Sequence, residues 1–124
     1  MLRLFNLFGK SAAMNALDDA LRACGVHPIL VPEAVKLTVT RLLKRDGAGS
    51  QDDLFGDAAE LLAYCILGRD GFEQSNGVAA ADRAEQRLQA AIDTGSHDAK
   101  LVLLALHAGL MAPDIADRVD VEDG

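Results

Sequence analysis

The side chains best suited to chemistry in this chain are two carboxylates and a phenol near its middle. Asp57, Glu60 and Tyr64 follow at spacings of three and four residues, which place them on one side of a helix. Paired carboxylates can act as a general acid and a general base. Both acids also fall in the first turns of the expected helix, where the helix dipole favours carboxylates, and no nucleophile accompanies them. The pattern favours a non-enzymatic protein and leaves an enzyme with an unrecognised carboxylate site as an alternative.

The other chemical motifs are incomplete. Gly9, Lys10 and Ser11 resemble the end of a phosphate-binding loop, but the glycine required five residues earlier is Leu4. We therefore expect no nucleotide and no other cofactor. The histidines lack a partner three or four residues away on the same helix, so no metal site is expected either; they are His27, His97 and His107.

Composition and charge restrict the class of partner. The chain has 124 residues, of which 50% are hydrophobic, and its net charge is −7. That charge argues against nucleic-acid binding, because Lys and Arg must neutralise phosphates. Cys24 and Cys65 fall on apolar helix stripes and are interpreted as core thiols of a cytoplasmic protein without a secretory leader. We expect one helical domain over residues 1–113 and an acidic tail over residues 114–124.

Two segments are candidates for contact with a partner. Lys36, Arg41, Lys44 and Arg45 give one expected helix a positive side, which could contact an acidic partner or the acidic tail. The alternative is a solvated helix face without a specific role.

The second segment is the N-terminus, where Leu2, Phe5 and Phe8 are flanked by Arg3 and Lys10. Such a segment could lie on a membrane surface. About two turns of helix bind a membrane weakly alone, so packing onto the rest of the protein is favoured.

Helical periodicity and turn residues predict an all-α fold with five main helices. Short loops make sequential helices antiparallel neighbours, in a repeat-like arrangement or an irregular bundle. A polar loop is expected over residues 69–77 and a short sixth element near Ile115. The five helices are expected at residues 11–24, 32–45, 54–68, 78–94 and 97–108.

Two of these segments match each other. Residues 57–68 and 98–109 align at a constant offset of 41 residues, with Asp57 and Asp98 among the identical pairs. A repeat of this length with helical periodicity is typical of stacked helix pairs.

Alanines, a glycine and two larger aliphatic residues between positions 84 and 103 add a family resemblance to this pattern. They are Ala84, Ala91, Ile92, Gly95, Ala99 and Leu103. Their spacing resembles the Sel-like relatives of the tetratricopeptide repeat, over residues 57–109. The resemblance implies a scaffold or adaptor that binds protein segments.

The most apolar expected helix covers residues 97–108. Its residues 101–106 are apolar nearly all the way round, which predicts a central or interfacial helix with Leu103 in the core. Together with the apolar N-terminal segment, this surplus of apolar surface predicts a two-fold homodimer. The sequence as a whole favours a small helical protein–protein interaction module.

Overall fold

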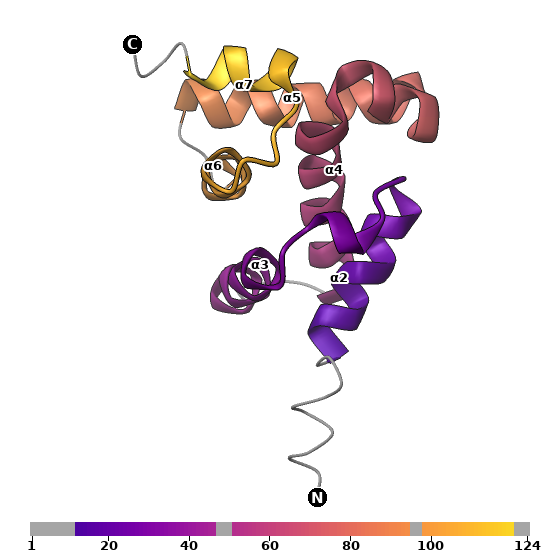
Figure 1. The fold of residues 1–124 in the computed structure, drawn as a ribbon, viewed down its shortest axis with the longest axis vertical. Coiled ribbons are helices and arrows are strands. Elements are labelled where there is room, and N and C mark those ends of the chain that lie inside the picture. Colours follow the sequence, from indigo (N-terminus) through magenta and orange to yellow (C-terminus); the bar gives the residue numbers. More distant parts are fainter. Residues whose placement is uncertain (1–11, 47–50, 95–97, 121–124) are drawn as a thin grey trace, which may run out of the picture.

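The computed structural model describes residues 12–46, 51–94 and 98–120, and every element in these residues is helical. The all-α class predicted from the sequence is therefore confirmed (Figure 1). Six α-helices and one 3-10 helix follow in the order α2 (Ala12–Ala23), η1 (Pro28–Leu30), α3 (Glu33–Asp46), α4 (Gln51–Asn76), α5 (Val78–Thr94), α6 (Ala99–His107) and α7 (Pro113–Asp120).

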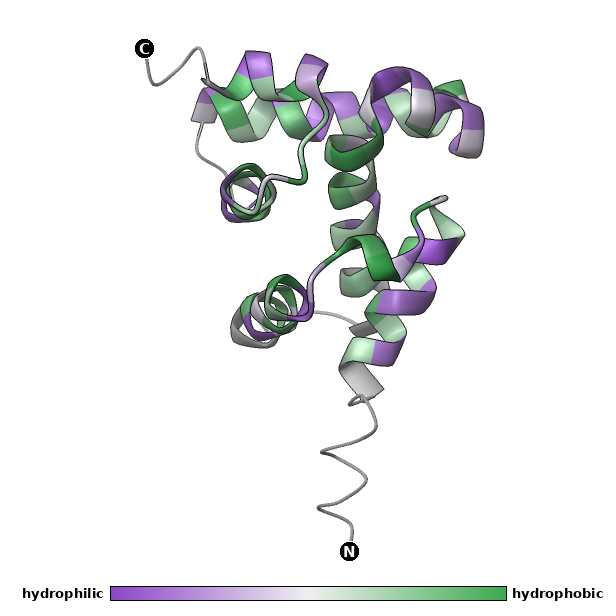
Figure 2. Ribbon diagram, viewed as in Figure 1, coloured by the Kyte–Doolittle hydropathy of each residue, from purple (hydrophilic) through white to green (hydrophobic). Residues whose placement is uncertain are grey.

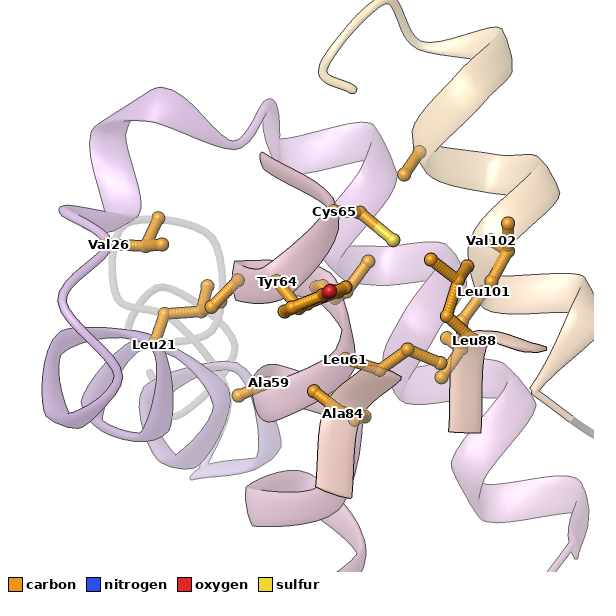
Figure 3. Close-up of a cluster of buried hydrophobic side chains, with 14 of the residues drawn as sticks. Leu21, Val26, Ala59, Leu61, Tyr64, Cys65, Ala84, Leu88, Leu101 and Val102 are labelled. Atoms are coloured by element: carbon orange, nitrogen blue, oxygen red, sulfur yellow. The ribbon is translucent and has the colours of Figure 1, made fainter. Parts of the chain in front are cut away.

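Helix α4 is the centre of the molecule and packs against every other α-helix described. In Figure 1 it stands between α2 and α3 at one end of the molecule and α5, α6 and α7 at the other. This position requires a helix that is apolar on several sides, and six of the seven residues from Ala59 to Cys65 are buried. Figure 3 shows Tyr64 of α4 between Leu21 and Val26 on one side and the leucines of α5 and α6 on the other.

The end of α2 is held by a left-handed glycine, as the sequence predicts. Gly25 has φ +93°, and the N–H of Val26 donates to the carbonyl of Leu21 at 2.9 Å, which closes the helix. A Cβ at Gly25 would lie 2.6 Å from the Oγ of Ser75, so the position also needs a residue without a side chain. The amide of Asn76 donates to the carbonyl of Cys24 at 2.8 Å. The ends of α2 and α4 are thereby fixed together.

The prediction of a polar loop over residues 69–77 is wrong, because the chain remains helical to Asn76. The expected stop at Gly68 is a break within α4, where the backbone adopts φ 79° and ψ 173° before the helix resumes. Phe72, the large apolar residue of this segment, is fully buried and contacts the ring of Tyr64 edge to face, with ring centroids 5.5 Å apart. Burial of Phe72 in the core stabilises a helix over this segment, although the polar composition of the segment predicts a loop.

The assignment of Leu103 to the core is also wrong, because its side chain is 47% exposed. Helix α6 instead buries Leu101, Val102 and Ala105. A nine-residue helix that is apolar nearly all round has more apolar surface than α4 and α5 can cover, so one side remains in solvent.

Residues expected to begin an acidic tail form α7. Its Ile115 and Val119 are 1% and 7% exposed and belong to the same core as α4 and α5. Helix α7 lies against α4, and its Arg118 reaches α5.

Candidate functional site

The most exposed large apolar residue described, Ile29, lies in η1. Ile29 is 80% exposed and Leu30 is 56% exposed, and both follow Pro28 in the short connection between α2 and α3. We call Ile29 and Leu30 the apolar tip. Figure 2 shows this turn in the green of hydrophobic residues, beside the more hydrophilic outer side of α2.

Hydrogen bonds hold the backbone of the apolar tip. The Nδ1 atom of His27 accepts the N–H of Ile29 at 3.2 Å, and the carbonyl of His27 accepts the N–H of Leu30 at 3.0 Å. The carbonyl of Pro28 accepts the N–H of Val31, also at 3.0 Å. His27 is thus the N-cap of η1, and its side chain stabilises the backbone of this turn.

A buried ion pair lies beneath the apolar tip. The Nζ of Lys36 in α3 is 3.1 Å from Oδ1 of Asp18 in α2, and the two side chains are 3% and 5% exposed. The same ammonium donates to the carbonyl of Pro28 at 3.5 Å. Because one cation joins α2, α3 and η1, it fixes how the tip projects from the two helices.

This geometry separates the four basic residues that the sequence placed on one face. Lys36 is buried and does not belong to an exposed basic surface, whereas Arg41 is exposed. The side chains of Lys44 and Arg45 lie outside the described residues. Lys36 and Arg41 are five residues apart on one helix, and the sequence cannot show that Asp18 pairs with Lys36.

A cavity of about 340 Å³ opens beside the apolar tip. Its wall combines aliphatic and proline side chains with charged ones, a mixture that is common in sites that bind a ligand or a partner's side chain. The lining residues are Arg22, His27, Pro28, Ile29, Val31, Pro32, Glu33 and Lys36.

The carboxylate pair predicted in α4 lies in a different and larger groove of about 660 Å³ between α4 and α5. Asp57 and Glu60 both line it, and Glu60 pairs with Arg83 of α5 at 3.2 Å. Tyr64 does not join them. It is fully buried, and its hydroxyl donates to Oε1 of Glu85 at 2.5 Å. Burial, followed by the interaction with Glu85, raises the pKa of Tyr64 to about 12, so the phenol stays protonated.

Cys24, Cys65 and His107 are the remaining candidate residues in the described part of the chain. Burial raises the pKa of Cys65 to about 12 and also raises the pKa of the half-buried Cys24, where Glu60 adds to the effect. Cys65 is a core residue as predicted, and both thiols are poor nucleophiles. His107 ends α6 in an exposed position. Among the described residues no cluster of three His, Cys, Asp or Glu side chains could bind a metal ion.

Several predicted residues lie outside the described parts of the chain: Leu2, Phe5, Phe8, the Gly9 to Ser11 motif and His97. In the described segments no helix combines the length and the apolar character needed to cross a membrane.

The sequence prediction missed the apolar tip. Its signal was three consecutive aliphatic residues, Ile29 to Val31, between Pro28 and Pro32 in a turn, where polar residues are usual. Comparison with family models, with curated proteins and with solved structures finds no match to this chain.

Proposed function

We propose that the protein is a small, non-enzymatic helical interaction module and that the apolar tip is its main contact surface. The observation that supports this is the 80% and 56% exposure of two aliphatic side chains on a turn with a held backbone. Complete burial of such a side chain stabilises a complex by about 1.5–3 kcal/mol. A turn already ordered in the free protein loses little conformational entropy on binding.

The groove around Asp57 and Glu60 supports a structural role for its charges. Arg87 donates to both carboxylate oxygens of Asp98 and to the backbone carbonyl of Asp57, so its hydrogen bonds join α4, α5 and the start of α6. The one phenol that the sequence grouped with these acids faces Glu85 instead.

The experiment for the apolar tip compares binding partners of three full-length variants. Ile29→Asp and Leu30→Asp place a charge in the tip, whereas Val78→Asp places one at the start of α5, where Val78 is as exposed as Leu30. We expect the first two variants to lose the partners captured by the wild type in quantitative affinity enrichment, and Val78→Asp to retain them. Far-UV circular dichroism checks that all three are folded. Retention of every partner by Ile29→Asp and Leu30→Asp would contradict the proposal.

We further propose that the pairs α3–α4 and α5–α6 are two copies of one repeat, as the resemblance to Sel-like scaffolds implies. The 41-residue match supports this, as does the contact of Arg87 with both equivalent aspartates, Asp57 and Asp98. Solenoid repeats contact mainly their neighbours, so an additional unit extends the fold. A tandem duplication of residues 58–98 should therefore keep the helix content per residue and a cooperative unfolding transition. A molten or insoluble product would oppose the repeat.

A second copy of this chain is a further proposed partner. The exposed side of Leu103 on α6 supports the expected dimer. Light scattering at micromolar concentration should give twice 13.1 kDa for the wild type and 13.1 kDa for Leu103→Asp. A wild-type mass of one chain would exclude self-association at that concentration.

A further inference from the structure

The start of η1 has one N–H group that the backbone of the helix does not satisfy. Pro28 occupies the first position and has no N–H, and the N–H of Leu30 donates to the carbonyl of His27 at 3.0 Å. The N–H of Ile29 remains, and its acceptor is the imidazole Nδ1 of His27 at 3.2 Å. One histidine nitrogen therefore completes the hydrogen bonding of the turn that carries the apolar tip.

This hydrogen bond requires a neutral imidazole. The Nδ1 atom of His27 accepts a hydrogen only when it carries no proton, so the ring proton is on Nε2. In an imidazolium both nitrogens are donors, and Nδ1–H would then face the N–H of Ile29, donor against donor. His27 is exposed, so a proton from solvent reaches the ring without any opening of the fold.

The two cations beside His27 already have carboxylate partners. Arg22 of α2 and Lys36 of α3 line the same cavity as His27. Arg22 lies 3.3 Å from Asp19, and Lys36 lies 3.1 Å from Asp18. Both pairs bind their carboxylates within α2 or between α2 and α3, so neither acid is left for the imidazole.

A carboxylate of α3 is available to a protonated His27. Glu33 begins α3, is exposed and lines the same cavity. It forms no ion pair with another residue that the structure describes. The imidazole therefore has two arrangements. When neutral it caps the N–H of Ile29, and when protonated it turns toward Glu33 and releases that N–H to water.

We propose that His27 is a pH-sensitive switch of the apolar tip: the neutral imidazole orders the turn, and protonation loosens it on the side of Ile29. The bonds from Leu30 to His27 and from Val31 to Pro28 join backbone groups and persist, so the turn loosens without unfolding. A less ordered side chain loses more conformational entropy on binding, so contacts through the tip weaken in acid. The use of this switch rests on the proposed function of the apolar tip, whereas the change in the turn is measurable without a partner.

The test measures how strongly the turn protects the N–H of Ile29 from exchange with water in the full-length protein. Magnetisation transfer from water, followed by NMR, gives a protection factor that is corrected for the intrinsic pH dependence of exchange. The imidazole resonances of His27 define the neutral and protonated forms in the same samples. We expect protection of Ile29 to fall at least about threefold when His27 is protonated, as for loss of an N-cap. Constant protection, or a neutral ring with its proton on Nδ1, would overturn the proposal.

Two substitutions of His27 represent the two states of the switch. In His27→Asn the amide oxygen accepts the N–H two residues on and does not titrate, so Ile29 should stay protected over the same pH range. In His27→Ala no cap exists, so protection should stay at the low value of the protonated wild type. A fall with pH in His27→Asn equal to that of the wild type would assign the effect to another group and overturn the proposal.

Two further variants exclude other titrating groups. Glu33→Gln removes the nearby carboxylate, and His107→Gln removes the exposed histidine at the end of α6. Both should keep the fall in protection at Ile29, and its loss in His107→Gln would contradict the assignment to His27. Partner capture by Ile29→Asp is independent of these data. A tip without partners leaves the NMR result unchanged, and a tip with partners but constant protection is a contact surface without a switch.

Discussion

Arg87 and Asp98 form a two-pronged ion pair between α5 and the start of α6. The Nε and Nη2 atoms of Arg87 each lie 3.1 Å from a different carboxylate oxygen of Asp98. The Nη1 atom donates to the backbone carbonyl of Asp57 in α4 at 2.6 Å. Charge and hydrogen bonds therefore hold together the junction of these three helices.

We predict that Arg87→Met destabilises the protein by about 1–2 kcal/mol, because three hydrogen bonds to charged or carbonyl oxygens are lost at a partly buried site. Arg83→Met is the matched control from the same groove. Its arginine is 62% exposed, so its loss should change the free energy of unfolding by about 0.5 kcal/mol or less. Urea denaturation measures both. Equal effects of the two substitutions would mean that the contacts of Arg87 are not stabilising.

Lys36→Met should destabilise the protein by about 3–5 kcal/mol, because it leaves the carboxylate of Asp18 buried without its cation. The double variant Asp18→Leu with Lys36→Met removes both charges and should recover a large part of this loss. Thermal and urea unfolding of the two single variants and the double variant form the cycle. A double variant as unstable as the sum of the singles would exclude coupling between these residues.

Substitution of two glycines of α4 by alanine should change the free energy of unfolding in opposite directions. Gly68→Ala should destabilise by about 1–3 kcal/mol, because φ +79° strains an L-residue and the new methyl group meets Asp114. Gly56 is helical, and a Cβ there would meet no atom within 4 Å, so Gly56→Ala should stabilise by about 0.5–1 kcal/mol. Unfolding midpoints in urea give the comparison. A stabilising Gly68→Ala would refute the left-handed break.

The docking of α7 should weaken in acid. The hydrogen bonds from Arg118 lower the pKa of Glu85 below its ordinary value of 4.5. A carboxylate with a lower pKa in the folded state contributes stability above its unfolded pKa, and this contribution is lost as the pH falls through the folded value. We therefore expect the stability difference between the wild type and Glu85→Gln to shrink progressively as the pH falls below 4.5. A difference that is constant between pH 3 and pH 7 would contradict this ionisation.

Local signals determined most helix boundaries in this protein. The helix predicted over residues 78–94 has the bounds of α5, and the end of α2 follows from Gly25. Both depend on residues within one or two turns of the boundary, since periodicity and left-handed glycines act on neighbouring backbone groups. The same local chemistry indicated a break at Gly68, where the backbone does leave the helical conformation.

The tertiary structure decided what each helix face contacts, and the predictions for Lys36, residues 69–77 and Leu103 failed for this reason. Lys36 meets Asp18 across 18 residues of sequence, and residues 69–76 are helical with Phe72 buried and Asp114 at their first N–H. Leu103 lies in solvent because a helix that is apolar on all sides has no preferred buried face. Amphipathic patterns orient a helix only when its sides differ. When all sides of a helix are apolar, the neighbouring helices decide which side is covered. The residues of those neighbours are distant in the chain, so the local sequence does not show the outcome.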